Sequence, residues 1–131
     1  MKIIIAIARF LLGLIFLVFG LNGFLHFIPA SLPSGTAGQF VGALFVSNYL
    51  VVVFLFQLIS AILLLINRYI PLALTLLAPI IVNILLFHAL MAPNGLSLAL
   101  FVSVLWILVF LSVRSSFGGL LQPRVPAQGL Q

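Results

Sequence analysis

Four long apolar stretches constrain this chain more than any other feature of its sequence. Each has about the 20 residues that an α-helix needs to cross the hydrocarbon core of a bilayer. The stretches cover residues 3–25, 40–66, 70–91 and 96–113. Hydrophobic residues make up 66% of the chain and charged residues only 4%, whereas soluble domains carry about 25% charged residues. The sequence therefore predicts an all-α integral membrane protein built as a four-helix bundle.

Turn-forming residues separate the four predicted spans. The breaks lie at Ile28–Thr36, at Asn67–Arg68 and at Ala92–Gly95, and they contain the Pro, Gly, Asn and Ser residues that are typical of turns. Only the first connection, residues 27–39, is long, so we expect one longer outer loop. The segment 115–131 has several Gly and Pro residues and no clear pattern, and we expect it to be a mobile tail beyond a transmembrane domain of residues 1–114.

The positions of the cations indicate the orientation of the spans. Lys2 and Arg9 precede or open the first span, Arg68 lies between the second and third, and Arg114 and Arg124 follow the fourth. Four crossings place all of these regions on one side of the membrane. The positive-inside rule then predicts that both termini are cytoplasmic, in the inner (plasma) membrane of a bacterium. Because the cations are scattered among apolar segments, we expect no nucleic-acid partner.

The composition excludes several kinds of chemistry. The chain has no Asp, no Glu and no Cys. It therefore has no carboxylate pair or Asp-based triad, no thiol relay and no side-chain carboxylate for a Ca²⁺ or Mg²⁺ site. We expect no catalytic residue and no metal site, and a role in binding or docking rather than independent enzymatic activity.

Small residues recur where helices are expected to approach one another. Gly13, Gly20 and Gly23 follow one another along the first span, and Gly38 and Gly42 form a Gly-x-x-x-Gly pattern at the start of the second. Such residues let transmembrane helices pack closely. We expect them to mediate helix contacts.

Polar side chains gather at similar depths in the outer half of the bundle, where each has a cost in free energy and is therefore informative. With a rise of about 1.5 Å per residue, they fall on three of the predicted helices. The predicted ligand-binding residues are Asn22, His26, Asn48, Asn83 and His88. Gln57, closer to the middle of the membrane, is a supporting residue.

Helical spacing predicts which of these residues share a face. Asn22 and His26 are four residues apart and face the same way, whereas Asn83 and His88 are about 140° apart on a straight helix. Pro79 cannot donate a hydrogen bond to the carbonyl of Thr75, which must find another partner or a water-filled cavity. We expect Asn83 to line such a cavity.

The two histidines have three interpretations. Each imidazole can hydrogen-bond a loop carbonyl at the membrane surface. Both can instead ligate a haem iron across the bundle, although the outer loops lack cations for the haem propionates, which makes haem the weaker cofactor candidate. The third interpretation is hydrogen bonding to a quinone or another lipophilic carbonyl compound, with Phe24, Phe27 and Phe87 as an apolar wall.

Three segments carry a resemblance to a known family. Residues 9–29, with the run Phe19-Gly20-Leu21-Asn22-Gly23-Phe24-Leu25-His26, together with residues 63–69 and 78–88, resemble the first three helices of the DoxX family. The resemblance implies a four-helix protein of the bacterial inner membrane that serves as an accessory subunit in redox systems, in association with a quinone-linked oxidoreductase. Relatives often carry Glu where this chain has Gln57, which argues against a proton-coupled role because an amide does not titrate.

The predicted function is therefore that of a small redox-associated membrane subunit that binds a quinone-like or other lipophilic ligand, while a partner protein performs the redox chemistry. The alternative is a small-solute transporter or a structural scaffold subunit of a membrane complex. The small size favours a homo-oligomer, because four helices enclose little space.

Overall fold

The computed structural model describes residues 1–29 and 31–127, which form helices and short connections without a strand. The helices are α1 (Lys2–Leu25), α2 (Gly35–Val46), α3 (Tyr49–Leu65), α4 (Ile70–Leu90) and α5 (Leu96–Ser112), with the short 3₁₀ helices η1 (Pro93–Gly95) and η2 (Arg114–Phe117). Ala30 of the predicted outer loop and residues 128–131 of the predicted tail lie outside the described residues.

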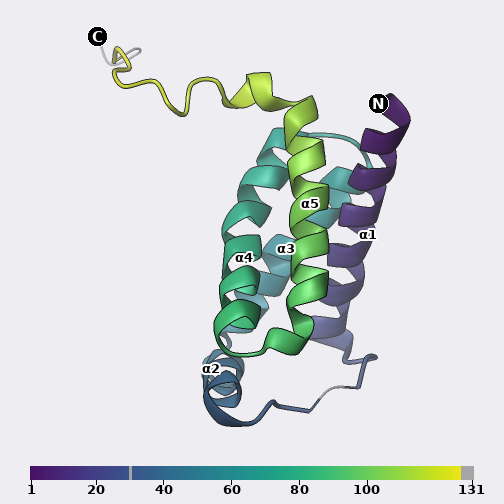
Figure 1. Cartoon of the computed structure of the whole chain (residues 1–131), viewed down its shortest axis with the longest axis vertical. Coiled ribbons are helices and arrows are strands. Elements are labelled where there is room, and N and C mark those ends of the chain that lie inside the picture. Colours follow the sequence, from purple (N-terminus) through teal and green to yellow (C-terminus); the bar gives the residue numbers. More distant parts are fainter. Residues whose placement is uncertain (30, 128–131) are drawn as a thin grey trace.

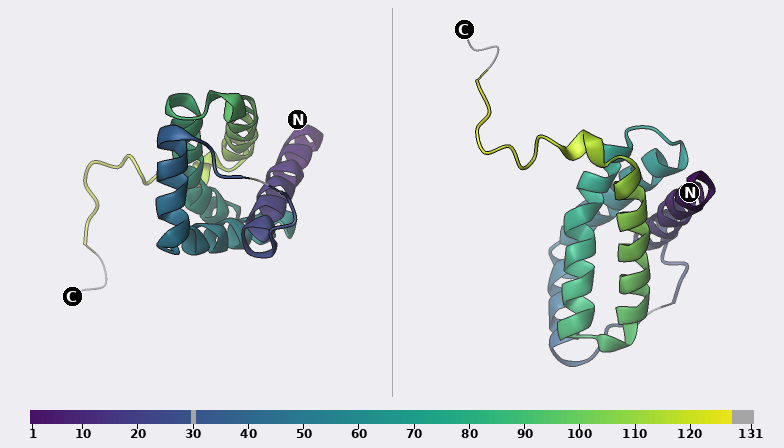
Figure 2. Two further views of the ribbon diagram at one scale, coloured as in Figure 1. Left: turned by 90° about the horizontal axis from the view of Figure 1, so that it is seen from below. Right: turned by 45° about the horizontal axis from the view of Figure 1, so that its top comes forward.

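Four helices, α1, α3, α4 and α5, run side by side (Figure 1). Helix α3 packs between α1 and α4, and α5 contacts both α4 and α1, so that the four surround a common core. Helix α2 lies across the end of this body that is remote from the N-terminus, as the two views in Figure 2 also show. The fully buried core side chains include Leu12, Leu64, Leu74, Leu77 and Val109.

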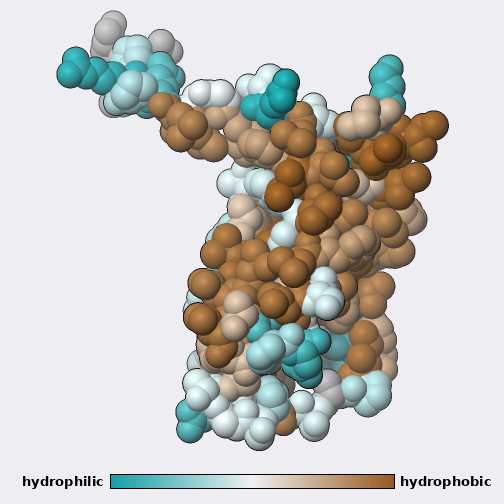
Figure 3. All heavy atoms as spheres, viewed as in Figure 1, coloured by the Kyte–Doolittle hydropathy of each residue, from teal (hydrophilic) through white to brown (hydrophobic). Residues whose placement is uncertain are grey.

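Three helices are long and apolar enough to cross a membrane by themselves: Lys2–Leu25, Ile70–Leu90 and Pro93–Ser112. The α2–α3 pair provides a fourth span if the two bent helices count as one. Large apolar side chains are exposed along these helices, and the surface in Figure 3 is predominantly hydrophobic between its two more polar ends. These features are those of a multi-pass membrane protein.

The second predicted span is wrong as a single continuous helix over residues 40–66. The chain bends by 83° between α2 and α3, where Asn48 has a left-handed backbone with φ of 62°. Asn adopts this conformation more readily than most residues. Helix α2 begins at Gly35, inside the predicted outer loop. At about 1.5 Å per residue, the 17 residues of α3 span roughly 25 Å.

The glycines of α1 confirm the prediction of close helix packing. A Cβ atom on Gly13 would lie 3.0 Å from Cγ of Leu65, and one on Gly20 would lie 3.0 Å from Cδ2 of Leu58. Both neighbours belong to α3, the helix with which α1 makes its most extensive contact. The Gly-x-x-x-Gly pattern on α2 does not mediate such packing at Gly42, because a Cβ atom there would meet open space.

Four of the five Lys and Arg residues lie at one end of the molecule, as the sequence predicted. The start of α1, the α3–α4 connection and the end of α5 lie together in Figure 1. We call this end, with Lys2, Arg9, Arg68 and Arg114, the cationic end. The opposite end, formed by the α1–α2 connection, α2 and η1, has no Lys or Arg in its sequence and is called the uncharged end.

The segment after α5 begins with more structure than the sequence predicted. Helix η2 forms at Arg114–Phe117, and the ring of Phe117 lies 5.1 Å from that of Phe110, centroid to centroid. Phe117 also packs against the buried core. This aromatic contact explains why the chain forms a short helix before the tail.

Trp106 connects α5 to α4. Its indole Nε1–H donates a hydrogen bond to the carbonyl of Leu74 at 3.0 Å, and its ring stacks on Phe110 at 5.2 Å between centroids. Leu74 precedes Thr75, whose carbonyl loses its usual donor at Pro79. The bond therefore ties α5 to the segment of α4 that the proline weakens.

Candidate functional site

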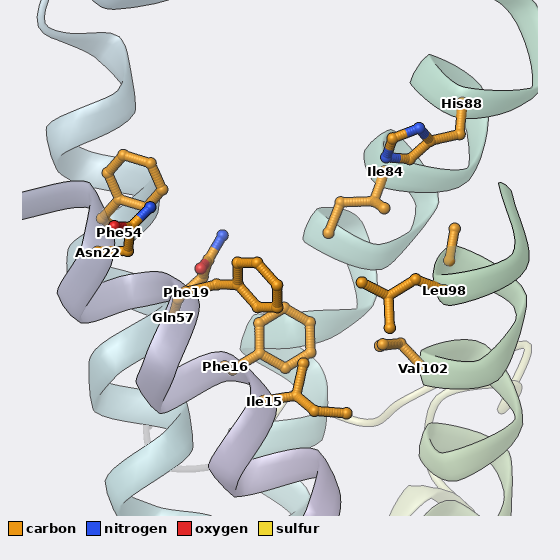
Figure 4. A pocket seen from close by; sticks show the side chains of 11 residues that line it. Ile15, Phe16, Phe19, Asn22, Phe54, Gln57, Ile84, His88, Leu98 and Val102 are labelled. Atoms are coloured by element: carbon orange, nitrogen blue, oxygen red, sulfur yellow. The ribbon is translucent and has the colours of Figure 1, made fainter. Parts of the chain in front are cut away.

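A cavity of about 310 Å³ lies between the four long helices (Figure 4). The positions of its lining residues along the helices place it in the half of the molecule nearer the uncharged end. All four helices contribute to its wall. The lining residues are Ile15, Phe16, Phe19 and Asn22 of α1, Phe54 and Gln57 of α3, Ile84 and His88 of α4, and Leu98, Ala99 and Val102 of α5. The wall is thus apolar except for two amides and one imidazole, which come from three different helices.

Gln57 is the most buried of these polar groups. Its side chain is 7% exposed, and its Oε1 atom has no hydrogen-bond partner among the residues that the structure describes. A buried acceptor without a partner costs about 1–3 kcal/mol. Rotation about the terminal torsion of Gln57, which is soft, presents either the oxygen or the nitrogen of the amide to the cavity.

His88 faces Gln57 from α4, on another side of the cavity (Figure 4). Its Nδ1 lies 3.0 Å from the carbonyl oxygen of Ala92. Because a carbonyl only accepts, Nδ1 carries the proton, and in the neutral imidazole Nε2 is an acceptor. The first interpretation of the histidines, a bond to a loop carbonyl, is confirmed for His88. Gly95 allows this arrangement, since a Cβ atom there would collide with the imidazole.

Asn22 lines the cavity from the end of α1. Its Oδ1 accepts a hydrogen bond of 2.7 Å from the backbone N–H of Ile28, so the side chain fixes the path of the chain as it leaves the helix. The two N–H groups of the amide remain as donors. Asn22 and Gln57 therefore place amides on neighbouring helices, α1 and α3.

Two of the predicted site residues lie away from this cavity because the chain leaves its helices where they occur. His26 follows the last residue of α1 with a left-handed backbone, φ 53°, so it no longer shares the helical face of Asn22. Asn48 occupies the break between α2 and α3. Both side chains are exposed.

Asn83 and Thr75 also lie outside the cavity, on the exposed face of α4. Asn83 Nδ2 donates to the carbonyl of Pro79 at 2.9 Å, and Thr75 Oγ1 donates to the carbonyl of Pro71 at 2.8 Å. Each polar group thus bonds to its own helix. His88 lines the cavity whereas Asn83 does not, so the two side chains do not share a site.

The aromatic wall differs from the predicted one. Phe24, Phe27 and Phe87 are absent from the lining, and Phe16, Phe19 and Phe54 take that role. On α1 the lining residues Ile15, Phe19 and Asn22 follow the i, i+4, i+7 spacing of one helical face. This spacing was available in the sequence and identifies Phe19 as an aromatic residue that shares the face of Asn22.

The polar groups of the cavity are complementary to a small amphipathic molecule. Amide N–H groups are available at Asn22 and Gln57, and an imidazole acceptor is available at His88, with apolar side chains between them. Such a site can bind and orient a ligand through one hydrogen bond at each side.

Comparisons of the chain with protein-family models, with curated proteins and with solved structures gave no match. The resemblance to the DoxX family therefore stays a prediction. The chemistry of the cavity is what indicates a function.

Proposed function

We propose that this chain is a multi-pass protein of the bacterial inner membrane, a four-helix bundle with both termini in the cytoplasm. The bent α2–α3 pair provides the second of its four spans. The distribution of charge supports this topology, because every Lys and Arg of the described helices lies at the cationic end and the connections at the other end have none.

In this orientation the cavity lies in the outer half of the membrane and binds a small lipophilic molecule. The observation that carries the proposal is the Gln57 carboxamide, which is buried against the cavity and whose oxygen has no partner among the described residues. A buried polar group without a partner is costly, and a ligand that hydrogen-bonds to it removes that cost. The volume of about 310 Å³ accommodates one substituted ring and lies within the usual range for ligand sites.

The hydrogen-bonding groups define the ligand more closely. A hydroxyl group would donate to Oε1 of Gln57, and a second hydroxyl group would donate to Nε2 of His88, while the amide N–H groups of Asn22 would donate to an oxygen of the ligand. A benzoquinol has oxygen atoms at opposite sides of one ring and matches this arrangement. The corresponding quinone lacks the donor for His88, and we therefore expect it to bind more weakly than the quinol.

The redox role is that of an accessory subunit, as the resemblance to the DoxX family implies. The sequence has no thiol or carboxylate side chain, so we propose that it binds the quinone-like molecule while a partner protein supplies the electron-transfer chemistry.

A titration of the purified chain in detergent with a short-chain benzoquinol and its quinone tests the proposal. Isothermal calorimetry on Gln57→Leu and His88→Phe measures the contribution of each polar group. Loss of one buried hydrogen bond corresponds to about tenfold weaker binding. Asn83→Leu and His26→Ala are matched controls, because they remove the same chemical groups outside the cavity.

We expect the controls to bind like the wild-type chain and the two cavity variants to bind about tenfold more weakly. Absence of saturable binding of both probes would refute the quinone-like ligand. Equal weakening in Asn83→Leu and Gln57→Leu would refute the location of the site.

A further inference from the structure

A second cavity, of about 290 Å³, lies at the cationic end. It is an open pocket lined by the first turns of α1, the α3–α4 connection and the last turn of α5. Lys2 and Arg9 both line it; they are seven residues apart, two helical turns, and so share one face of α1. Asn67 and Ser112 add polar groups from the other two elements.

The two cations have no carboxylate side chain with which to pair, because the sequence contains neither Asp nor Glu. Arg9 is half-buried, and its Nη1 donates to the carbonyl of Leu64. A guanidinium has five N–H donors, so most of them remain for another acceptor. A partly buried cation is costly without a counter-ion. Because no side chain of this protein can supply one, the geometry favours a bound external anion.

The rest of the wall indicates which kind of anion fits. Ile5 and Val109 line the same cavity, and the neighbouring residues Ile3 and Ile4 are exposed apolar side chains. A free inorganic anion would leave this apolar surface uncovered. An anionic phospholipid would place its phosphate on the cations and its glycerol and upper acyl carbons against the apolar wall.

We infer that this cavity binds the phosphate group of an anionic phospholipid, with Arg9 and Lys2 as the charged ligands. The inference rests on the proposed membrane embedding but not on the quinone-like ligand, which occupies the other half of the molecule. Bound in this way, the lipid ties the start of α1 to the end of α5, where the sequence offers no carboxylate side chain for an ion pair.

Native mass spectrometry of the full chain in a neutral detergent tests the inference. The probes are phosphatidylglycerol, phosphatidylcholine and inorganic phosphate, of which only the first combines a net negative charge with acyl chains. The test variant is Lys2→Gln with Arg9→Gln. The matched control is Arg114→Gln with Arg124→Gln, which removes the same two charges outside the cavity.

We expect the wild-type chain to bind phosphatidylglycerol in preference to the other two probes. At about fivefold in affinity for each cation near the membrane surface, the cavity variant should bind roughly 30-fold more weakly, whereas the control should change little. If the double variant does not fold, Lys2→Gln alone, at an exposed position, should bind about fivefold more weakly.

Three results would overturn the inference. Equal weakening of lipid binding in the two double variants would indicate general attraction to a cationic surface, and unchanged binding in the cavity variant would exclude Lys2 and Arg9 as ligands. Binding of inorganic phosphate as tight as that of phosphatidylglycerol would indicate a site for free anions. Release of the wild-type chain from native membranes by alkaline carbonate would instead refute the membrane embedding, so the two failures are distinguishable.

Discussion

Replacement of Gln57 by Leu should stabilise the ligand-free protein while it weakens ligand binding. The amide is 7% exposed, and its Oε1 atom lacks a partner in the described structure. Leu has a similar volume and no polar atom, and it would face Phe16 and Phe54 in the cavity wall. Removal of one unsatisfied buried acceptor corresponds to a gain of about 1–3 kcal/mol in the free energy of unfolding.

The measurement is equilibrium unfolding in mixed micelles without added ligand, followed by circular dichroism. Ser60→Ala is the control on the same helix. Ser60 is fully buried, but its Oγ already donates to the carbonyl of Phe56 at 2.8 Å. Its removal loses a satisfied bond, and we expect a destabilisation of about 1 kcal/mol or less.

The sign of the change in unfolding free energy for Gln57→Leu decides whether the Gln57 oxygen is unsatisfied in the ligand-free protein. Destabilisation by 1 kcal/mol or more, a magnitude typical of a lost hydrogen bond, would mean that the carboxamide is satisfied in the folded protein. The argument for a ligand at this position would then be refuted. Stabilisation together with weaker quinol binding is the combination that a site maintained for its ligand should produce.

Two further substitutions test the contacts that shape the bundle. Trp106→Phe retains the aromatic ring but removes the hydrogen bond to Leu74, and we expect a loss of about 1 kcal/mol in unfolding free energy in the same assay. Gly95→Ala should displace the imidazole of His88 from Ala92 and destabilise the protein by about 0.5–1.5 kcal/mol. This loss of stability should disappear when His88 is also replaced by Ala. Additive losses in the double variant would refute the steric explanation.

The spans that end at a Pro, a Gly or a cation were predictable from the sequence. Helices α1, α4 and α5 agree with the predicted spans to within a residue or two at each end, because an apolar run terminated by Pro, Gly or a cation has few alternatives. The second span was not predictable in this way. Ser47 and Asn48 are flanked by apolar residues on both sides, and hydropathy does not report the left-handed φ of Asn48.

The residues that line the cavity were predictable from the sequence only in part. Asn22 and His88 were expected near a common site, and Gln57 was expected beside it; the structure places all three around one cavity. His26 was assigned to the face of Asn22 by its i+4 spacing, but the α-helix ends at Leu25 and helical phase has no meaning beyond that residue. Spacing arguments therefore hold only inside an element, and the residues at its ends need the backbone geometry.

The absence of acidic side chains links the two cavities. In a soluble protein, a half-buried cation such as Arg9 commonly pairs with a carboxylate, and a buried amide such as Gln57 commonly finds a polar side chain or water. This chain has no carboxylate side chain to offer and few polar ones in its interior. The two groups differ in kind, since Arg9 is a cation and Gln57 is a neutral amide. Arg9 therefore requires an anionic headgroup as its external partner, and Gln57 requires an uncharged ring with hydrogen-bonding oxygens. Substitutions in one cavity should leave binding at the other unchanged.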